Sequence, residues 1–158
     1  MVNKMRRVII VAVLLFVVAS LPGCGDLNAT YDDNAAIASS GDSSSARAST
    51  SIIIGHSLSV TATMTGSRTI WSYNALSDVD ITVSYSLSVT DGGKAKLVLI
   101  TPDDEVITLV ENADKTQTGD LQSKTVSLQA GKNRIKIVGY DSPRFDLKLS
   151  VEEGVLDW

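Results

Sequence analysis

A strict two-residue alternation constrains the fold of this chain more than any other feature. Between Ile81 and Thr90 every odd position is apolar and every even position is Ser or Thr. Successive side chains of a strand point to opposite faces, so this pattern predicts a strand with one buried and one solvated face. The same alternation recurs from Leu58 to Met64 and from Phe145 to Val151. Three such strands need a shared core, which favours an antiparallel sheet.

Further short strands are predicted between these three, because apolar segments alternate with clusters of Gly, Pro and Asp that are typical of turns. They span Arg68 to Tyr73, Ala95 to Thr101, Val106 to Val110, Lys124 to Gln129 and Asn133 to Tyr140. The predicted turns are centred on Gly66, Gly92, Asp103, Gly131 and Ser142.

About eight strands with no sustained helical period predict an all-β domain over residues 51–158, a single antiparallel β-sandwich that is jelly-roll-like. The apolar positions of the alternating segments are expected to form its core: Val60, Val83, Tyr85, Leu87, Leu97, Leu99, Leu128, Ile135, Ile137, Leu147 and Leu149.

The N-terminus has the features of a secretion signal. Lys4, Arg6 and Arg7 precede an uncharged apolar run of 12 residues from Val8 to Ala19, and small residues follow. A permanent membrane helix needs about 20 apolar residues, so a cleaved signal peptide over residues 1–23 is the better interpretation. An uncleaved membrane anchor stays open as the alternative.

The end of this run, Leu21-Pro22-Gly23-Cys24, resembles the lipobox of bacterial lipoproteins. The resemblance implies that the Cys24 thiol receives a diacylglyceryl group and that a peptidase cuts after Gly23. Cys24 is the only cysteine, so it has no partner for an internal disulfide. We therefore expect Cys24 to attach the chain to the lipid bilayer.

The charge of the processed chain limits the classes of partner that it can bind. The full chain has 14 basic and 18 acidic residues, and loss of Lys4, Arg6 and Arg7 would lower the net charge from −4 to −7. This charge opposes binding to nucleic acid or to anionic lipid. The expected location is the cell membrane, lipid-anchored and facing outside the cytoplasm, or the outer membrane of a host that has one. Gly25, rather than an acidic residue, follows Cys24, and this favours the outer membrane.

The segment from residue 24 to residue 50 changes to Ser, Ala, Asp, Asn and Gly, with Leu27, Tyr31 and Ile37 as its only large apolar residues. Such a composition predicts a flexible, lipidated tether, with a reach of about 25 to 30 Å. A short helix from Ala29 to Ala38 is the alternative, because Ala35-Ala36-Ile37-Ala38 has fair helix propensity.

Two segments of the domain, from Leu97 to Val106 and from Val126 to Ile137, resemble the hairpin and the Gly-led penultimate strand of prepeptidase C-terminal type domains. These are accessory modules of secreted bacterial proteins. The resemblance implies a non-catalytic binding or stabilising module.

Residues with catalytic or metal-binding chemistry are sparse. His56 is the only histidine, no nucleophile motif surrounds any serine, and the lone cysteine is expected to be acylated. No catalytic residue, cofactor or metal ligand is therefore assigned, and the chain is not expected to be an enzyme. A structural calcium ion remains an alternative, if loop acids converge at one end of the sandwich: Asp91, Asp103, Asp104 and Asp141.

Three other groups have both a structural and a binding interpretation. Trp71 and Tyr73 share one strand face and would either form a sugar-stacking platform or belong to the core. Lys132, Arg134 and Lys136 alternate opposite Ile135, which predicts a solvated strand face or an anionic docking patch. The C-terminal Trp158 either folds back or forms a docking tail.

The sequence thus predicts a membrane-anchored binding module for an envelope protein or a cell-wall polymer. A carbohydrate-binding module that uses Trp71 and Tyr73 is the first alternative, and an extracytoplasmic enzyme the second.

Overall fold

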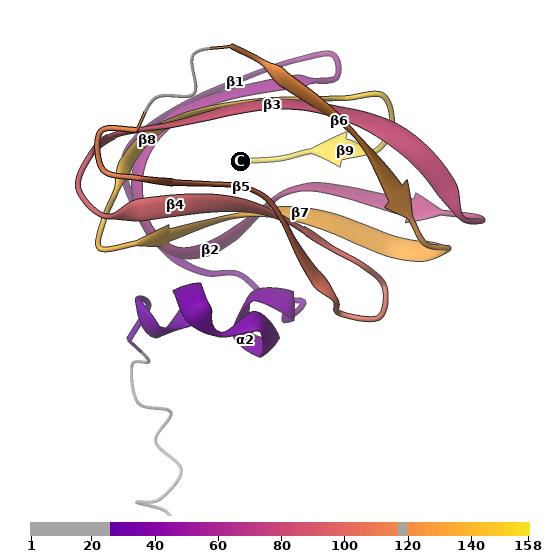
Figure 1. Cartoon of the computed structure of the whole chain (residues 1–158), viewed down its shortest axis with the longest axis horizontal. Coiled ribbons are helices and arrows are strands. Elements are labelled where there is room, and N and C mark those ends of the chain that lie inside the picture. The colour runs from indigo at the N-terminus through magenta and orange to yellow at the C-terminus, as the bar shows by residue number, and fades with distance from the viewer. Residues whose placement is uncertain (1–25, 117–119) are drawn as a thin grey trace, which may run out of the picture.

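The computed structural model describes residues 26–116 and 120–158 (Figure 1). The expected signal peptide and Cys24 lie outside these residues. The predicted all-β class is confirmed, and the helical structure among the described residues is restricted to two short elements near their N-terminal end. The elements are η1 (Ala29–Asp32), α2 (Asn34–Ala38), β1 (Ser43–Ile54), β2 (Ser57–Ala75), β3 (Val79–Asp91), β4 (Lys94–Ile100), β5 (Val106–Ala113), β6 (Gln122–Leu128), β7 (Gly131–Tyr140), β8 (Arg144–Val151) and β9 (Val155–Leu156).

The strands form one antiparallel sheet that curls into two facing layers (Figure 1). Its order is β5-β4-β7-β2-β8-β3-β6, and β1 and β9 also pair with β2. The first part of β2, Ser57 to Thr63, pairs with β8, and its second part, Gly66 to Ala75, pairs with β7. Strand β2 therefore belongs to both layers and joins them.

The predicted turn at Gly66 is wrong, because β2 continues through this residue. Gly66 has a φ of +94°, and a Cβ atom on it would lie 2.0 Å from the carbonyl oxygen of Ser43 in β1. The turn between β7 and β8 lies against the same point of β2, where the Met64 amide donates to the Pro143 carbonyl over 3.2 Å. Gly66 thus allows β1 to approach closely where β2 passes between the layers.

The core lies between the two layers, and it confirms the burial that the alternating sequence pattern predicted. All eleven predicted core residues are buried, and Val83, Leu87 and Ile137 are fully excluded from solvent. The one phenol among them, Tyr85, donates its hydroxyl hydrogen to the Leu109 carbonyl over 3.0 Å. Its polar atom is therefore satisfied inside the sandwich.

The prediction of a flexible tether is wrong for residues 26–50. The cap segment, residues 26–42, carries η1 and α2 and packs on the outer side of the layer that contains β4 and β7 (Figure 1). Tyr31 and Ile37 are buried there, and the Asp33 side chain accepts a hydrogen bond from the Ala36 amide at the start of α2. These apolar residues give the segment its own small core with Val98, Ile100 and Val138.

The helical alternative describes the cap segment better, although the structure divides it between η1 and α2. The rest of the expected tether forms β1, an edge strand that pairs only with β2 and exposes almost all of its side chains. Within residues 26–116 and 120–158 no helix is long and apolar enough to cross a bilayer.

Candidate functional site

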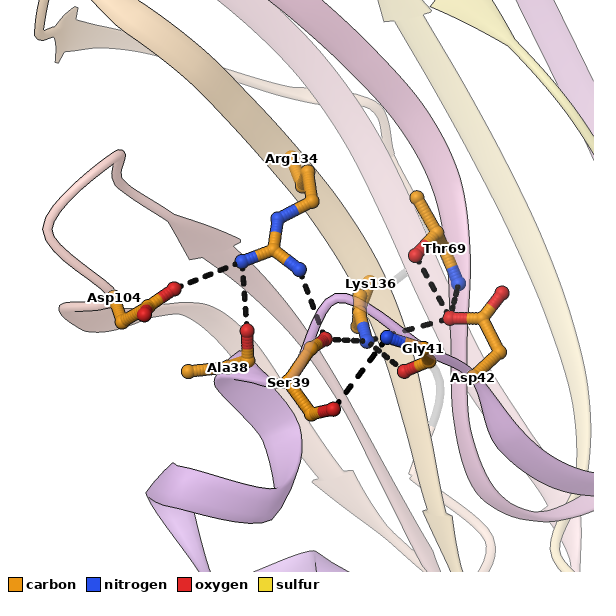
Figure 2. A network of polar contacts seen from close by, with 8 residues as sticks. All are labelled: Ala38, Ser39, Gly41, Asp42, Thr69, Asp104, Arg134 and Lys136. Carbon is orange, nitrogen blue, oxygen red and sulfur yellow. Dashed lines mark hydrogen bonds and ion pairs between the residues drawn. The ribbon is translucent and has the colours of Figure 1, made fainter.

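The basic residues of β7 do not form a solvated face, so that prediction is wrong. Strand β7 lies inside the sheet between β4 and β2, and the cap segment covers its outward side. Lys136 is 0% exposed and Arg134 is 7% exposed, whereas Lys132, at the start of the strand, is exposed. Figure 2 shows both buried cations directed at the backbone that follows α2.

Lys136 and Arg134 bind the end of the cap segment. The Lys136 ammonium donates to the carbonyl oxygens of Ser39 and Gly41, over 2.8 and 2.9 Å (Figure 2). The Arg134 guanidinium donates to the carbonyl oxygens of Ser39 and Ala38, over 2.8 and 2.7 Å. The last carbonyls of a helix have no partner within the helix, so these cations satisfy them. The pair holds the cap segment on the sheet and is not a docking patch.

Two carboxylates complete this network. Asp42 lies 3.3 Å from the Lys136 ammonium and also accepts hydrogen bonds from the amide and hydroxyl of Thr69. Burial lowers the pKa of Lys136, and the nearby Asp42 charge opposes that shift. Asp104 forms an ion pair with Arg134 at 3.1 Å. One member of the predicted acidic turn therefore has a structural partner.

The four acids considered for calcium lie at two ends of β4. A Cβ atom on Gly92 would lie 3.6 Å from the Asp141 carbonyl, which places Asp91 and Asp141 near each other. Pro102, beside Asp103 and Asp104, instead lies against Gly131. In the part of the chain that the structure describes, no group of three or more His, Cys, Asp or Glu residues could hold a metal ion.

Trp71 cannot serve as a sugar platform, because it is only 1% exposed. Its indole Nε1 donates to the Glu153 carbonyl over 2.6 Å, and its ring stacks on the partly buried Tyr73 at 6.2 Å. Trp158 packs against the same core and meets the Phe145 ring edge-on at 6.3 Å. The core interpretation therefore holds for Trp71, and the fold-back interpretation holds for Trp158.

His56 lies in the two-residue turn between β1 and β2 and is exposed. Its backbone carbonyl accepts a hydrogen bond from the Val151 amide, and its imidazole makes no hydrogen bond or ion pair within the described ranges. Among the described residues, no serine or threonine hydroxyl is hydrogen-bonded to the His56 ring.

The outward side of the layer β1-β2-β8-β3-β6 carries an ordered array of hydroxyl groups. The pairing registers align Ser57, Ser150, Ser84 and Ser123 in one row across β2, β8, β3 and β6. The Ser57 and Ser150 hydroxyls lie 3.1 Å apart, and those of Ser84 and Ser123 lie 2.8 Å apart. The serines of these two pairs are thus within hydrogen-bond distance of each other.

Two more rows follow along the same strands. One contains Ser59, Lys148 and Ser86, and the next contains Thr61, Asp146 and Ser88. Asp146 accepts a hydrogen bond from the Thr61 hydroxyl over 2.5 Å. We call this surface the hydroxyl face, formed by Ser57, Ser59, Thr61, Ser84, Ser86, Ser88, Ser123, Asp146, Lys148 and Ser150. A shallow groove of about 220 Å³ lies where this face meets β1, and it is lined by Thr50, Ile52, Ser59, Val60, Thr61, Asp146, Leu147 and Lys148.

The sequence predicted that these side chains face outward, but not that they form rows. Alternation assigns a residue to a face, whereas alignment across strands depends on register and on strand order. Ser57 and Ser150 are 93 residues apart in the chain, and no local sequence pattern relates them.

No protein-family model matches the chain, and no curated protein sequence matches it. Among solved structures, it is similar to a carbohydrate-binding module of Cellvibrio mixtus lichenase 5A in complex with cellotriose, with 17% identity over 72% of this chain and 88% of the other and a TM-score of 0.36. It is also similar to the C-terminal carbohydrate-binding module of a marine laminarinase from Zobellia galactanivorans, with 16% identity, coverage of 67% and 90%, and a TM-score of 0.34. The capsid protein VP2 of infectious bursal disease virus matches with 14% identity, coverage of 72% and 33%, and a TM-score of 0.33.

Proposed function

We propose that this protein is a lipid-anchored, non-catalytic binding module of the cell envelope, and that its hydroxyl face binds a cell-wall glycan. The observation that carries the proposal is the alignment of Ser57, Ser150, Ser84 and Ser123 across four neighbouring strands. Polar outer faces are common in antiparallel sheets. Three successive rows of hydroxyl-bearing residues, with one acid and one base at their centre, make a repeating surface of donors and acceptors.

The chemistry of the hydroxyl face favours a polymer over a protein. Each hydroxyl both donates and accepts hydrogen bonds, which matches the hydroxyl and amide groups that recur along a glycan. Protein interfaces instead concentrate Tyr, Trp and Arg and are depleted in Ser. With Trp71 in the core, recognition would rest on hydrogen bonds across an open face rather than on ring stacking.

Membrane anchoring through Cys24 is part of this proposal, and the lipobox-like Leu21-Pro22-Gly23-Cys24 supports it. A Cys24→Ser chain should move from the membrane fraction to the soluble fraction, because acyl chains would no longer hold it. Mass spectrometry of the wild-type chain should find a diacylglyceryl group on Cys24. A Cys24→Ser chain that stays in the membrane fraction would contradict the anchor.

Binding through the hydroxyl face is tested with the acylated chain in detergent micelles, by co-sedimentation with purified peptidoglycan and with insoluble neutral polysaccharides. A triple variant, Ser59→Ala, Thr61→Val and Ser86→Ala, removes three hydroxyls from the face. Each neutral hydrogen bond contributes about 0.5 to 1.5 kcal/mol, so the loss of three should weaken binding about tenfold or more.

A matched control removes three hydroxyls from elsewhere: Ser49→Ala, Ser77→Ala and Thr108→Val. All three positions are exposed and lie off the hydroxyl face, so this variant should bind as the wild type does. Equal binding by the two triple variants, or no binding of any wall polymer by the wild type, would contradict the proposal.

A protein partner at the β1 edge is the second candidate. Ile52, Ile53 and Ile54 are 56%, 46% and 74% exposed, and β1 pairs with β2 alone. An open edge with exposed apolar residues can accept an extended segment of another chain as an added strand. An Ile53→Lys variant should abolish capture of such a partner and leave co-sedimentation with wall polymers unchanged.

A further inference from the structure

A second groove lies where the described chain begins. Its volume is about 320 Å³, and its lining comes from the cap segment, β1, β2 and the turn between β7 and β8. The lining residues are Asp26, Leu27, Ser45, Arg47, Thr63, Thr65 and Ser142. It contains one base, one acid and four hydroxyl groups. Thr63 and Thr65 follow Thr61 on the outward side of β2, so the groove adjoins the hydroxyl face at its end nearest the cap segment.

The position of Asp26 in the chain sets the height of this groove above a membrane. Cys24 is two residues before Asp26, and two residues span at most about 7 Å even when fully extended. The folding of residues 26–50 removes the long tether that would separate the domain from its anchor. With Cys24 acylated, Asp26 and the groove that it lines therefore lie at the level of the lipid headgroups.

We infer that this groove binds a zwitterionic phosphoethanolamine headgroup of a lipid in the bilayer that holds the anchor, an inference that rests on the proposed acylation of Cys24. The Arg47 side chain is exposed and makes no hydrogen bond or ion pair with any other described residue. Guanidinium groups bind phosphate oxygens well, and the nearby hydroxyls of Ser45 and Thr63 add further donors. The Asp26 carboxylate supplies the opposite charge for the headgroup ammonium.

The charge of the chain favours this headgroup over an anionic one. The processed chain has a net charge of −7, and Asp26 belongs to the groove itself. A phosphoglycerol headgroup would bring its phosphate to Arg47 but would leave Asp26 without a cation. Phosphoethanolamine matches both charges within one groove.

The test uses the acylated chain in vesicles and a single fluorescent label. Because Cys24 is the only cysteine and its thiol is acylated, an introduced cysteine is labelled uniquely. Ala46→Cys places the label between Ser45 and Arg47, on the other face of β1, so that it does not fill the groove. Leu76→Cys, 96% exposed beyond the far end of β2, is the distant control.

Vesicles contain a trace of spin-labelled phosphatidylethanolamine or spin-labelled phosphatidylglycerol at equal mole fraction, with the nitroxide on the acyl chain next to the headgroup. The label at residue 46 should be quenched roughly two- to fivefold more by the phosphatidylethanolamine probe, a preference of the size of an exposed ion pair. Arg47→Ala should abolish the preference. Lys124→Ala, which removes an exposed charge from β6, should keep it.

Equal quenching by the two lipids would overturn the inference, as would equal quenching at residues 46 and 76. Either result on a vesicle-bound, acylated chain leaves the anchor itself intact. A chain without a diacylglyceryl group on Cys24 by mass spectrometry overturns both the anchor and the headgroup site.

Discussion

The ammonium of Lys136 lies 3.3 Å from a carboxylate oxygen of Asp42, and the Lys136 side chain is completely buried. Lys136 comes from the middle of β7, and Asp42 ends the cap segment. This ion pair therefore joins the start of the described chain to an interior strand of the sheet. The backbone carbonyls of the cap segment accept hydrogen bonds from Lys136 and Arg134, and the segment covers both side chains. The cap segment is therefore part of the folded domain.

Replacing Lys136 with Met should destabilise the protein by about 2 to 4 kcal/mol. The substitution keeps the volume of the side chain but leaves the Ser39 and Gly41 carbonyls without their donor and Asp42 without its counter-ion. Urea unfolding measures the loss, and limited proteolysis should show faster cleavage in the cap segment. Lys132→Met, on the exposed start of the same strand, should cost less than about 0.5 kcal/mol. Equal stability of the two variants would contradict the role given to Lys136.

Tyr31 should make part of the stability depend on alkaline pH. Burial, followed by its hydrogen bond to Glu111, raises the pKa of Tyr31 above the usual value of 10.0. The folded chain then keeps a proton that the unfolded chain loses, so this contribution is complete below pH 10 and declines as the pH rises further.

A Tyr31→Phe variant isolates this effect. Below pH 10 it should be less stable than the wild type by about 1 kcal/mol, because the hydrogen bond to Glu111 is lost. Above pH 10 the wild type should lose about 1.4 kcal/mol per pH unit more than the variant, because only the wild type has the Tyr31 hydroxyl, so the difference should shrink and change sign near pH 11. Urea unfolding at pH 8 and pH 11 measures both values. A difference that stays constant between these pH values would show that Tyr31 ionises normally in the fold.

Leu87→Ala should cost about 2 to 5 kcal/mol, because Leu87 is fully buried between the layers and its truncation leaves a cavity. Leu76→Ala removes the same atoms from a residue that is 96% exposed and should change stability by less than about 0.5 kcal/mol. The free energy of unfolding of each variant checks the assignment of the faces. A cost below about 1 kcal/mol for Leu87→Ala would contradict it.

Trp71→Ala should lower stability by about 3 to 5 kcal/mol, because it empties a large volume of the core and leaves the Glu153 carbonyl without a donor. In a Trp158→Phe background Trp71 is the only tryptophan, and its emission should be blue-shifted in the folded state. Wall-polymer binding by folded Trp71→Phe should match that of the wild type. A Trp71→Phe variant that folds normally but loses binding would show that Trp71 contributes to the ligand site.

The core could be predicted from the sequence because burial in a sheet follows a local period. Leu87 and Leu147 are recognised from their immediate neighbours, and their packing across β3 and β8 only adds to what each strand already indicates. Strand β1 has no such signal. Its side chains are almost all exposed, and its strand conformation depends on pairing with β2 rather than on a buried face.

The cap segment and the buried cations could not be predicted, because each depends on the other. Alternation placed Lys136 correctly on the side opposite Ile135, but only the position of residues 26–42 decides whether that side is solvated. Conversely, Tyr31 and Ile37 are too few to predict folding unless a surface exists to receive them. The hydroxyl face could not be predicted for a similar reason, since its rows depend on the pairing register of strands that are distant in the sequence.

The dual membership of β2 has a consequence for how the protein is made. Its two parts pair with β8 and β7, so neither layer can close until residues 131–151 are available, and Ser57 must wait for a partner 93 residues later. Folding that depends on such distant contacts is slow. A chain that crosses a membrane N-terminus first therefore stays open until nearly all of it has passed. If the chain is exported as proposed, this topology would delay its folding until export is nearly complete.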